Sequence, residues 1–494
     1  MLNAVREPVT APASSADRIF RNVVYLSGSL VATSIVTTLW TLFVPRRIGP
    51  HGMGLIVMAW SAFSIFQAVG SFGMRTLLVR EIAADVRRAP ELLGSAMVVR
   101  LLSIAPFLAI TGLYVLLGHF GGEQALVLYL ATGVAACLLL SDPYLAAFQA
   151  IERMKFVAFA DVLNKTLLSA CGIALVVMGF GATALVALML VAAAIVLMVS
   201  AIWSRRYFTI DWHVDPARLS ALVKDSLPYW GYALFSTFYL WVGSAMLAVM
   251  VPTRVVGWYG GPTKLLGTLM FVPVILSMAW LPKLVTAFTE SPQRLKQVAR
   301  MPTEQMLVLS LPVSVGAALI ADPLIKFLYG PEFLPSIAVF IVLTLSVVPT
   351  YFNWAAYQIL VACKRQAAWT KALAFVSVVN PVLNLVLIPT FQARDGNGAI
   401  GAALSFLITE TLLLGIAFMV IHPFLHRQTL TRVLKSALAT AGMAGAVSLV
   451  GGGLVVKVAV GAATFLALAV LLRIATSEEI RVVRRQLRLE HARG

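Results

Sequence analysis

Five cations lie within or directly beside long apolar runs of the sequence, where a charged side chain has chemical consequences. They are Arg46, Arg47, Arg75, Arg254 and Lys264. A cation surrounded by hydrocarbon is unfavourable, so each must reach the aqueous interface or line a polar cavity inside the protein. The residue types leave both possibilities open for all five. Arg100, early in another apolar run, is expected to be an anchor at the membrane surface.

Two carboxylates, Asp142 and Glu410, lie deeper in apolar runs. There a carboxylate needs a cation, a hydrogen-bond donor or a proton. Both residues are therefore candidates for binding a driving ion, H⁺ or Na⁺, and a structural hydrogen bond or ion pair is the alternative. Asp161 and Glu304 are expected at the starts of helices, where a carboxylate stabilises the helix dipole.

Amides and a proline interrupt the apolar run that precedes Glu410. Asn380 and Asn384 are four residues apart and share a helix face, which predicts hydrogen bonds to neighbouring helices. Pro389 weakens backbone hydrogen bonding and indicates a hinge. The small residues of "GAIGAA" are expected to allow close helix packing where the chain re-enters the membrane after the following turn.

Long hydrophobic helices must position all of these residues. The chain is 60% hydrophobic and 12% charged, with a mean hydropathy of +0.90, whereas soluble domains are about 45–50% apolar and 25% charged. Runs of about 20 apolar residues, enough to cross a membrane, recur without the alternation of a β-barrel. We predict an all-α polytopic membrane protein with about 14 spans, at residues 22–44, 54–78, 94–118, 125–148, 160–180, 182–203, 227–251, 257–282, 304–328, 335–361, 369–391, 398–421, 433–452 and 454–473.

The connections between these spans divide the cations unequally. The side that carries the N-terminus holds most of them, whereas the opposite side holds only Arg46, Arg47, Arg254, Lys326, Arg394 and Lys457. The positive-inside rule therefore places both termini in the cytoplasm, in agreement with an even number of spans. Topology and contact with anionic membrane lipids account for the net charge of +17, so no nucleic-acid partner is expected.

The polar segments have simple interpretations. Residues 1–21 form a cytosolic N-terminal segment that lacks the apolar core of a signal peptide. Residues 204–226 are a cytosolic linker, and residues 474–494 are a basic cytosolic tail that lies at anionic lipid. The three cysteines form no CxxC or Cys/His cluster, so neither a disulfide framework, a metal site nor a cofactor is predicted.

Two short segments recur at nearly the same offset. "PRRIGPHGMG" (45–54) is similar to "PTRVVGWYGG" (252–261), and "AFQAIERMKF" (147–156) corresponds to "LVACKRQAAW" (360–369). Both pairs indicate a six-span unit that occurs twice in the same orientation. We expect an N-lobe at 22–203, a C-lobe at 227–421, and two further spans at 433–473.

These segments also resemble a known family. "RRIGPHGMGLIVMAWSAFSIFQAVGSFGM", "AFQAIERMKFVAFADVLNK", "VGWYGGPTKLLGTLMFVPVILSMAWLPKL", "DPLIKFLYGPEFLPSIAVFIVL" and the Asn380–Glu410 stretch are similar, in this order, to segments of polysaccharide transporters and O-antigen flippases. That family belongs to the multidrug/oligosaccharidyl-lipid/polysaccharide exporter superfamily. The resemblance covers roughly residues 20–420, and the ordered succession of the motifs carries it. Many relatives have an acidic residue in span seven, where this chain has Gly243 and Ser244.

The resemblance implies a bacterial inner-membrane flippase. Its cargo would be a saccharide linked through pyrophosphate to a polyprenol, moved to the periplasmic leaflet by alternating access of the two lobes, without ATP hydrolysis by this chain. O-antigen, capsule or exopolysaccharide export is the implied pathway, with a polysaccharide polymerase as a possible partner. Because bare saccharide and pyrophosphate cannot cross hydrocarbon, the embedded cations would line a polar cavity, and at least one of Arg75, Arg254 and Lys264 would be essential.

Two other functions compete with this one. An ion-coupled multidrug or metabolite antiporter of the same superfamily has a similar helix pattern. A membrane glycan polymerase or ligase is disfavoured because such enzymes usually carry a large periplasmic loop with catalytic Arg or His, and every predicted periplasmic connection here is short. No Walker A, HExxH or nucleophile-elbow motif occurs in the sequence, so we predict a transporter and not an enzyme.

Overall fold

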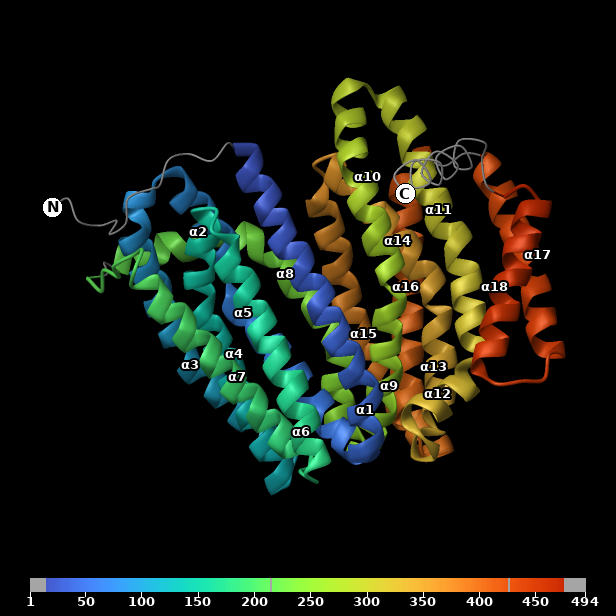
Figure 1. Cartoon of the computed structure of the whole chain (residues 1–494), viewed down its shortest axis with the longest axis horizontal. Coiled ribbons are helices and arrows are strands. Elements are labelled where there is room, and N and C mark those ends of the chain that lie inside the picture. The colour runs from blue at the N-terminus through green and yellow to red at the C-terminus, as the bar shows by residue number, and fades with distance from the viewer. Residues whose placement is uncertain (1–14, 214–215, 425–426, 475–494) are drawn as a thin grey trace, which may run out of the picture. The chain divides into compact units, whose positions relative to one another are not determined.

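The computed structural model of the chain describes residues 15–213, 216–424 and 427–474, which are almost entirely helical (Figure 1). The α-helices are α1 (Ser15–Ser71), α2 (Met74–Ala84), α3 (Ala89–Leu117), α4 (Gly122–Ala150), α5 (Met154–Thr166), α6 (Gly172–Val177), α7 (Ala182–Ser204), α8 (Pro216–Met250), α9 (Thr253–Leu269), α10 (Phe271–Glu290), α11 (Pro292–Leu319), α12 (Ala321–Tyr329), α13 (Ser336–Leu345), α14 (Val347–Ala362), α15 (Gln366–Asp395), α16 (Gly398–Ile421), α17 (Arg427–Leu449) and α18 (Leu454–Leu471). Short 3₁₀ turns at Val86–Arg88, Pro331–Phe333 and His422–Phe424, and a π-helical turn at Leu167–Cys171, connect some of them.

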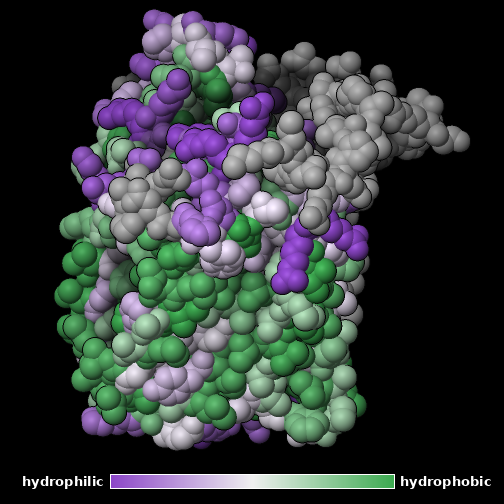
Figure 2. Space-filling model, turned by 90° about the vertical axis from the view of Figure 1, so that its left-hand side faces the viewer, coloured by the Kyte–Doolittle hydropathy of each residue, from purple (hydrophilic) through white to green (hydrophobic). Residues whose placement is uncertain are grey.

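The prediction of an all-helical membrane protein is confirmed. Every predicted span coincides with one helix, with part of a helix, or with consecutive helices. Within the described residues, 11 helices are long and apolar enough to cross a membrane, or 12 if the bent pair α11–α12 forms one span. The side chains of predicted span 22–44 lie mostly outside the described residues, and α17 is less apolar because Arg432 and Lys435 lie in its first half. Figure 2 shows a face with a broad hydrophobic band between hydrophilic ends, as expected for a lipid-facing surface.

The structure joins the first two predicted spans in one kinked helix and breaks several other predicted spans into two helices. The predicted turn between the first two spans is a kink within α1 at Gly49, whose φ is 68°. Phe72 and Gly73, with φ values of 44° and 67°, separate α1 from α2. α11 and α12 meet at an angle of 63°. The break before α2 matters most for function, because it places Arg75 in the first turn of a new helix.

The chain packs as two compact units. Unit 1 comprises residues 1–261 and 377–402, and unit 2 comprises residues 262–376 and 403–494. This division by packing differs from the two six-span lobes expected from the repeat, and those lobes stay a prediction. Residues 1–14 of the predicted N-terminal segment, 214–215 of the predicted linker and 475–494 of the predicted tail lie outside the described residues.

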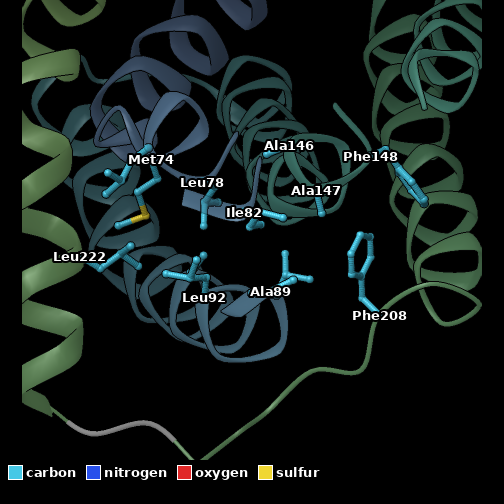
Figure 3. Packing of buried hydrophobic residues seen from close by; sticks show 13 residues of the cluster. Met74, Leu78, Ile82, Ala89, Leu92, Ala146, Ala147, Phe148, Phe208 and Leu222 are labelled. Atoms are coloured by element: carbon cyan, nitrogen blue, oxygen red, sulfur yellow. The ribbon is translucent and has the colours of Figure 1, made fainter. Parts of the chain in front are cut away.

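A cluster of buried apolar residues joins α2, α3, α4 and α8 at one end of unit 1 (Figure 3). It includes Met74, Leu78, Ile82, Leu92, Phe148 and Phe208. Phe208 follows α7, and three residues later the backbone nitrogen of Asp211 donates to the carbonyl of Pro90 at 3.0 Å. The first part of the predicted linker is therefore packed onto unit 1 instead of forming a free loop.

Unit 2 is organised around α11. This helix packs against α10, α14 and α17, and α17 packs against α18. Exposed leucines at positions 430, 434 and 438 of α17 follow the four-residue spacing of one helix face. The α17–α18 pair therefore has one face that suits lipid and another that packs on α11.

Candidate functional site

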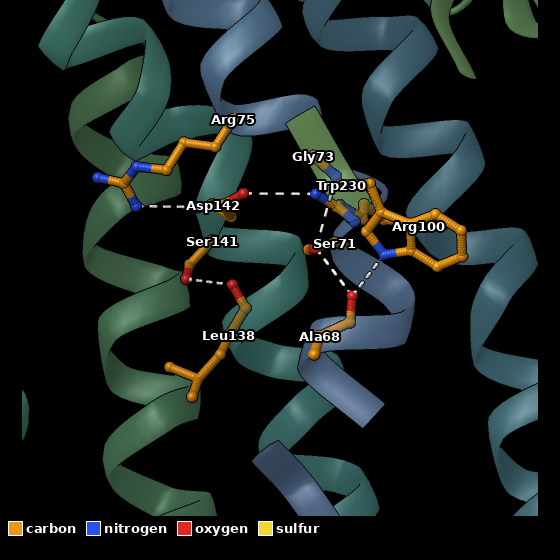
Figure 4. A network of polar contacts seen from close by, with 9 residues as sticks. All are labelled: Ala68, Ser71, Gly73, Arg75, Arg100, Leu138, Ser141, Asp142 and Trp230. Carbon is orange, nitrogen blue, oxygen red and sulfur yellow. Dashed lines mark hydrogen bonds and ion pairs between the residues drawn. The ribbon is translucent and has the colours of Figure 1, made fainter. Parts of the chain in front are cut away.

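A charge network inside unit 1 joins three residues from three helices (Figure 4). Asp142 of α4 accepts a hydrogen bond from Nη1 of Arg75 at 2.9 Å through one carboxylate oxygen. Its other oxygen accepts from Nη2 of Arg100, on α3, at 3.3 Å. Arg75 also donates to the side-chain oxygen of Gln149 at 3.3 Å. We call Arg75, Asp142 and Arg100 the charge triad.

The expected place of Arg100 at the membrane surface is wrong. Its side chain is 0% exposed, because it is enclosed where α3 packs against α4, and it lies about three turns into α3. Its Nε and Nη1 atoms have no hydrogen-bond partner among the described residues. The triad therefore carries two guanidinium groups and one carboxylate, and one guanidinium is completely enclosed.

The helix break before α2 is held from a neighbouring helix. The indole nitrogen of Trp230, on α8, donates to the carbonyl of Ala68 at 2.8 Å, and the hydroxyl of Ser71 donates to the same carbonyl at 2.9 Å. Trp230 also packs against Phe72, with ring centroids 5.5 Å apart. These contacts fix the end of α1 and with it the start of α2, where Arg75 lies (Figure 4).

The three arginines at the predicted outer turns lie on the surface. Arg46 and Arg47 are exposed on α1 beside the Gly49 kink, and Arg254 is exposed in the first turn of α9. The guanidinium of Arg47 lies 5.5 Å from the ring centroid of Phe43, and that of Arg254 lies 5.1 Å from the ring of Trp258. Such cation–π contacts stabilise exposed arginines modestly. A cavity-lining role for these three residues stays a prediction.

Lys264 lies further along α9 and is partly buried. It belongs to unit 2, whereas Arg254 belongs to unit 1, because the division between the units crosses α9 after Gly261. Among the predicted cations, Arg75 forms an ion pair with another predicted site residue, Asp142.

Glu410 forms a second polar centre, within unit 2. Its side chain on α16 is 4% exposed. One carboxylate oxygen accepts from the hydroxyl of Thr350 and from the amide nitrogen of Asn353, both at 2.9 Å and both from α14. The Asn353 amide also donates to the Glu410 carbonyl at 3.1 Å. The side-chain oxygen of Asn353 is buried and has no partner among the described residues.

Asn380 and Asn384 pair with each other on α15. The Asn384 amide donates to the Asn380 side-chain oxygen at 2.7 Å, and both side chains are buried. Within the described residues the side-chain oxygen of Asn384 has no hydrogen-bond partner, and the predicted hydrogen bonds of the two asparagines to neighbouring helices stay a prediction. The amide nitrogen of Asn384 lies 3.8 Å from the position that a Cβ atom would take at Gly243. α15 runs through Pro389 without a break, and its hinge role stays a prediction.

The two repeated glycine-containing segments meet within unit 1. A Cβ atom at Gly257 would lie 1.8 Å from the carbonyl oxygen of Pro50, and one at Gly54 would lie 2.0 Å from that of Thr253. Contacts this short require glycine, so α1 and α9 approach each other backbone to backbone. The sequence showed that the segments are similar, but it gave no sign that they touch.

Glu304 is at the centre of a third network, which joins α11 to α17. It is 1% exposed and accepts from Arg300 at 2.7 Å, from Thr429 at 2.8 Å and from Arg432 at 2.5 Å. Its expected position at a helix start is wrong, because α11 begins at Pro292, three turns earlier. Asp161 also lies inside a helix, α5, where it pairs with Lys165 at 3.0 Å.

Sequence reasoning found Arg75, Asp142 and Glu410 but missed what they contact. Arg100 was visible as a cation in an apolar run, but the sequence did not show that neighbouring helices enclose its side chain. Thr350 and Asn353 carry no such signal, since isolated polar residues are common in membrane helices.

The fold is that of a multi-pass helical membrane protein. More specifically, the chain belongs to the polysaccharide biosynthesis protein family, whose model matches residues 19–288. A curated relative, the probable low-salt glycan biosynthesis flippase Agl15 of Haloferax volcanii, is 21% identical over 388 residues, which cover 75% of this chain and 77% of the relative.

Solved structures show the same fold. The lipid II flippase MurJ, in an inward closed conformation, superimposes with a TM-score of 0.71 and 12% identity over 92% of this chain and 99% of MurJ. An inward-facing multidrug transporter of the MATE family, in the MOP superfamily, superimposes with a TM-score of 0.61 and 15% identity over 84% of this chain and 98% of that one. The resemblance to the polysaccharide transporter family stated from the sequence is confirmed by the match to the family model.

Proposed function

We propose that the chain is a flippase that moves a polyprenyl-diphosphate-linked saccharide from the cytosolic to the outer leaflet by alternating access. The observation that carries the proposal is the family match together with a fold like that of the lipid II flippase over 92% of the chain. The Agl15 relative, itself described as a probable glycan flippase, supports it. O-antigen, capsule or exopolysaccharide assembly in a bacterial inner membrane, with both termini cytosolic, is the setting in which we expect this activity.

Reconstituted transport tests this proposal. The full chain is placed in proteoliposomes with a polyprenyl-diphosphate oligosaccharide that carries a fluorophore, and a membrane-impermeant quencher reports which leaflet holds the lipid. We expect exchange between leaflets well above that of protein-free liposomes. No exchange above that background, in liposomes that contain correctly folded protein, would contradict the proposal.

An ion-coupled multidrug antiporter is the second candidate, because the MATE transporter shares the fold. The same proteoliposomes distinguish the two functions when they are loaded with hydrophobic cations in place of the glycolipid. Export of the cations without exchange of the glycolipid would favour the antiporter. Exchange of the glycolipid alone would favour the flippase.

We propose Glu410 as the residue that binds the driving ion. It is almost fully buried, three donor contacts from Thr350 and Asn353 position it, and the buried Asn353 oxygen beside it is an acceptor without a partner. A carboxylate together with an amide oxygen is a donor set that suits H⁺ or Na⁺. Asp142, the other candidate, already has two guanidinium partners, so its charge needs no additional cation.

Glu410→Gln is therefore expected to remove the dependence of transport on a proton or sodium gradient. Gradient-driven transport should fall by about tenfold, which corresponds to about 1.4 kcal/mol, while passive exchange between leaflets persists. The measurement is initial rate with and without each gradient in turn. Glu290→Gln, at an exposed surface carboxylate, should leave the gradient response unchanged. A Glu410→Gln variant that still responds to both gradients like the wild type would exclude the coupling role.

A further inference from the structure

We propose that a pocket between α10 and α11, in unit 2, binds the headgroup of an anionic glycerophospholipid, whose phosphate is recognised by Lys283 and Arg294. The ligand is a lipid of the surrounding membrane and not the cargo, so the inference does not depend on the proposed flippase function. It rests on the size of the pocket, on two cations that line it from different helices, and on the change from apolar to polar surface along the α10–α11 hairpin (Figure 1).

The pocket has the size of a ligand site and a fixed wall. Its volume is about 670 Å³, within the range of about 300–1,000 Å³ that is typical of small-molecule sites. Trp280 and Met301 are the lining residues farthest from the tip of the hairpin at Ser291. The indole nitrogen of Trp280 donates to the side-chain oxygen of Gln305, on α11, at 2.8 Å. This hydrogen bond joins the two helices and holds the Trp280 ring in place beside the pocket.

Two positive charges line the pocket, one from each helix. The ammonium group of Lys283 lies 4.6 Å from the ring centroid of Trp280, and no carboxylate of the described residues pairs with it. Arg294 has a loose contact of 3.5 Å with Glu290, in which both side chains are more than half exposed. Exposed pairs of this kind are weak, and Glu290 has no part in the binding that we assign. Two cations and one carboxylate leave a net positive charge, so an anion between the helices is favoured.

The position of the pocket along the hairpin favours a lipid over a soluble anion. Before the pocket, α10 exposes apolar side chains that suit hydrocarbon, those of Phe271, Ile275 and Met278. From Lys283 onward, the exposed residues that line the pocket are polar. A different face of α10 stays apolar as far as Phe288, which is 38% exposed. Acyl chains and headgroups can therefore reach the same part of the hairpin, and tryptophan and lysine are typical of such a boundary.

The chemistry of the lining suits a phosphodiester with a hydroxylated headgroup. The phosphate oxygens can accept from an ammonium and a guanidinium group at once. The exposed amide of Gln297 lines the pocket between these cations and its inner end. The Thr286 hydroxyl donates to the carbonyl of Pro282 at 3.1 Å, so its oxygen can accept from a hydroxyl of glycerol. A choline group would instead bring a third cation to the pocket, which predicts a preference for phosphatidylglycerol over phosphatidylcholine.

Lipid binding to the purified full chain, measured by native mass spectrometry in detergent, tests this inference. The probes are phosphatidylglycerol, phosphatidylcholine and glycerophosphoglycerol, which is the first headgroup without its acyl chains. We expect phosphatidylglycerol to bind at least about tenfold more tightly than the other two. Glycerophosphoglycerol that binds as tightly as the lipid would overturn the inference in favour of a site for soluble phosphate esters. Equal binding of the two lipids would overturn it as well.

Substitutions then assign the preference to this pocket. Lys283→Gln and Arg294→Gln should each weaken phosphatidylglycerol binding by about fivefold, the effect of one cation at an anionic lipid, without changing phosphatidylcholine binding. Lys283→Arg keeps the charge and should bind within about twofold of the wild type. Lys296→Gln is the matched control, because it removes the same charge from an exposed position on α11 that does not line the pocket. It should bind phosphatidylglycerol like the wild type.

The pattern across these variants decides the inference. Wild-type preference retained by Lys283→Gln or by Arg294→Gln would overturn it. A loss in Lys296→Gln as large as that in Arg294→Gln would also overturn it, because the attraction would then belong to the whole basic surface. Melting temperatures identify a variant that folds poorly, and if Lys283→Gln does so, the exposed Arg294 position decides alone. None of these outcomes alters the leaflet-exchange test of the proposed function.

Discussion

A Gly257→Ala substitution is expected to lower the melting temperature of the purified chain by several degrees and to reduce transport at least tenfold. The new Cβ would lie 1.8 Å from the carbonyl oxygen of Pro50 and 2.7 Å from its carbonyl carbon. A backbone carbonyl cannot turn aside as a flexible side chain can, so α1 and α9 would have to separate. Overpacking of this kind costs about 1–3 kcal/mol, and about 1.4 kcal/mol suffices for a tenfold change in rate. Thermal unfolding and the leaflet-exchange assay measure the two effects.

The same helix offers a matched control. A Cβ at Gly267, also on α9, would have no atom within 4 Å, so Gly267→Ala should keep wild-type transport and stability. A small gain of about 0.5–1 kcal/mol is expected, because alanine favours a helix over glycine. Gly54→Ala should repeat the Gly257 defect from the other side of the contact, near Thr253. If Gly257→Ala behaves like Gly267→Ala, the close backbone contact is not needed.

The second large effect is expected from Glu304→Ala, which should destabilise unit 2 by about 3–5 kcal/mol. Glu304 is the shared partner of Arg300, Thr429 and Arg432, and Arg432 is only 12% exposed. Without the carboxylate, the guanidinium groups of Arg300 and Arg432 would lie in a mostly buried environment without their anionic partner. The contact that joins α17 to α11 would also be lost. Thermal unfolding with a fluorescent probe on α17 would report both the loss of stability and the early release of that helix.

A surface carboxylate on the neighbouring helix serves as the control for Glu304. Glu290 pairs with Arg294 at 3.5 Å, and both side chains are more than half exposed. Exposed pairs of this kind contribute about 0–1 kcal/mol, so Glu290→Ala should have little effect. Equal effects of the two substitutions would show that the Glu304 network does not hold α17 in place.

Hydropathy predicted the helical membrane fold well, because a helix that crosses the hydrocarbon core needs about 20 consecutive, mostly apolar residues, and such runs are visible in the sequence. It could not place helix ends that extend beyond the lipid. α11 begins in the polar stretch at Pro292, which moved Glu304 from an expected helix start to the middle of a helix. α3 likewise begins earlier than predicted, at Ala89, which places Arg100 about three turns into the helix.

Contacts between residues that are far apart in the sequence were the other feature that the sequence did not predict. Asp142 and Arg75 were both singled out from the sequence, yet nothing in their spacing indicated that they form an ion pair with a third residue, Arg100. The Glu410 centre likewise depends on how α14 and α16 face each other. Composition and periodicity describe one helix at a time, whereas each of these centres is defined by the packing of two or three helices.

The discontinuous composition of unit 1 has a consequence for how the protein is made. Residues 377–402 belong to this unit although residues 262–376 of unit 2 are translated between its two parts. At about 5–20 residues per second, the ribosome needs on the order of ten seconds after residue 261 before unit 1 can be completed. During that interval the inserted helices of unit 1 lack the segment that carries Asn380 and Asn384. Nascent chains that stall in this window should be preferred clients of membrane chaperones and proteases, although their N-terminal half is already in the bilayer.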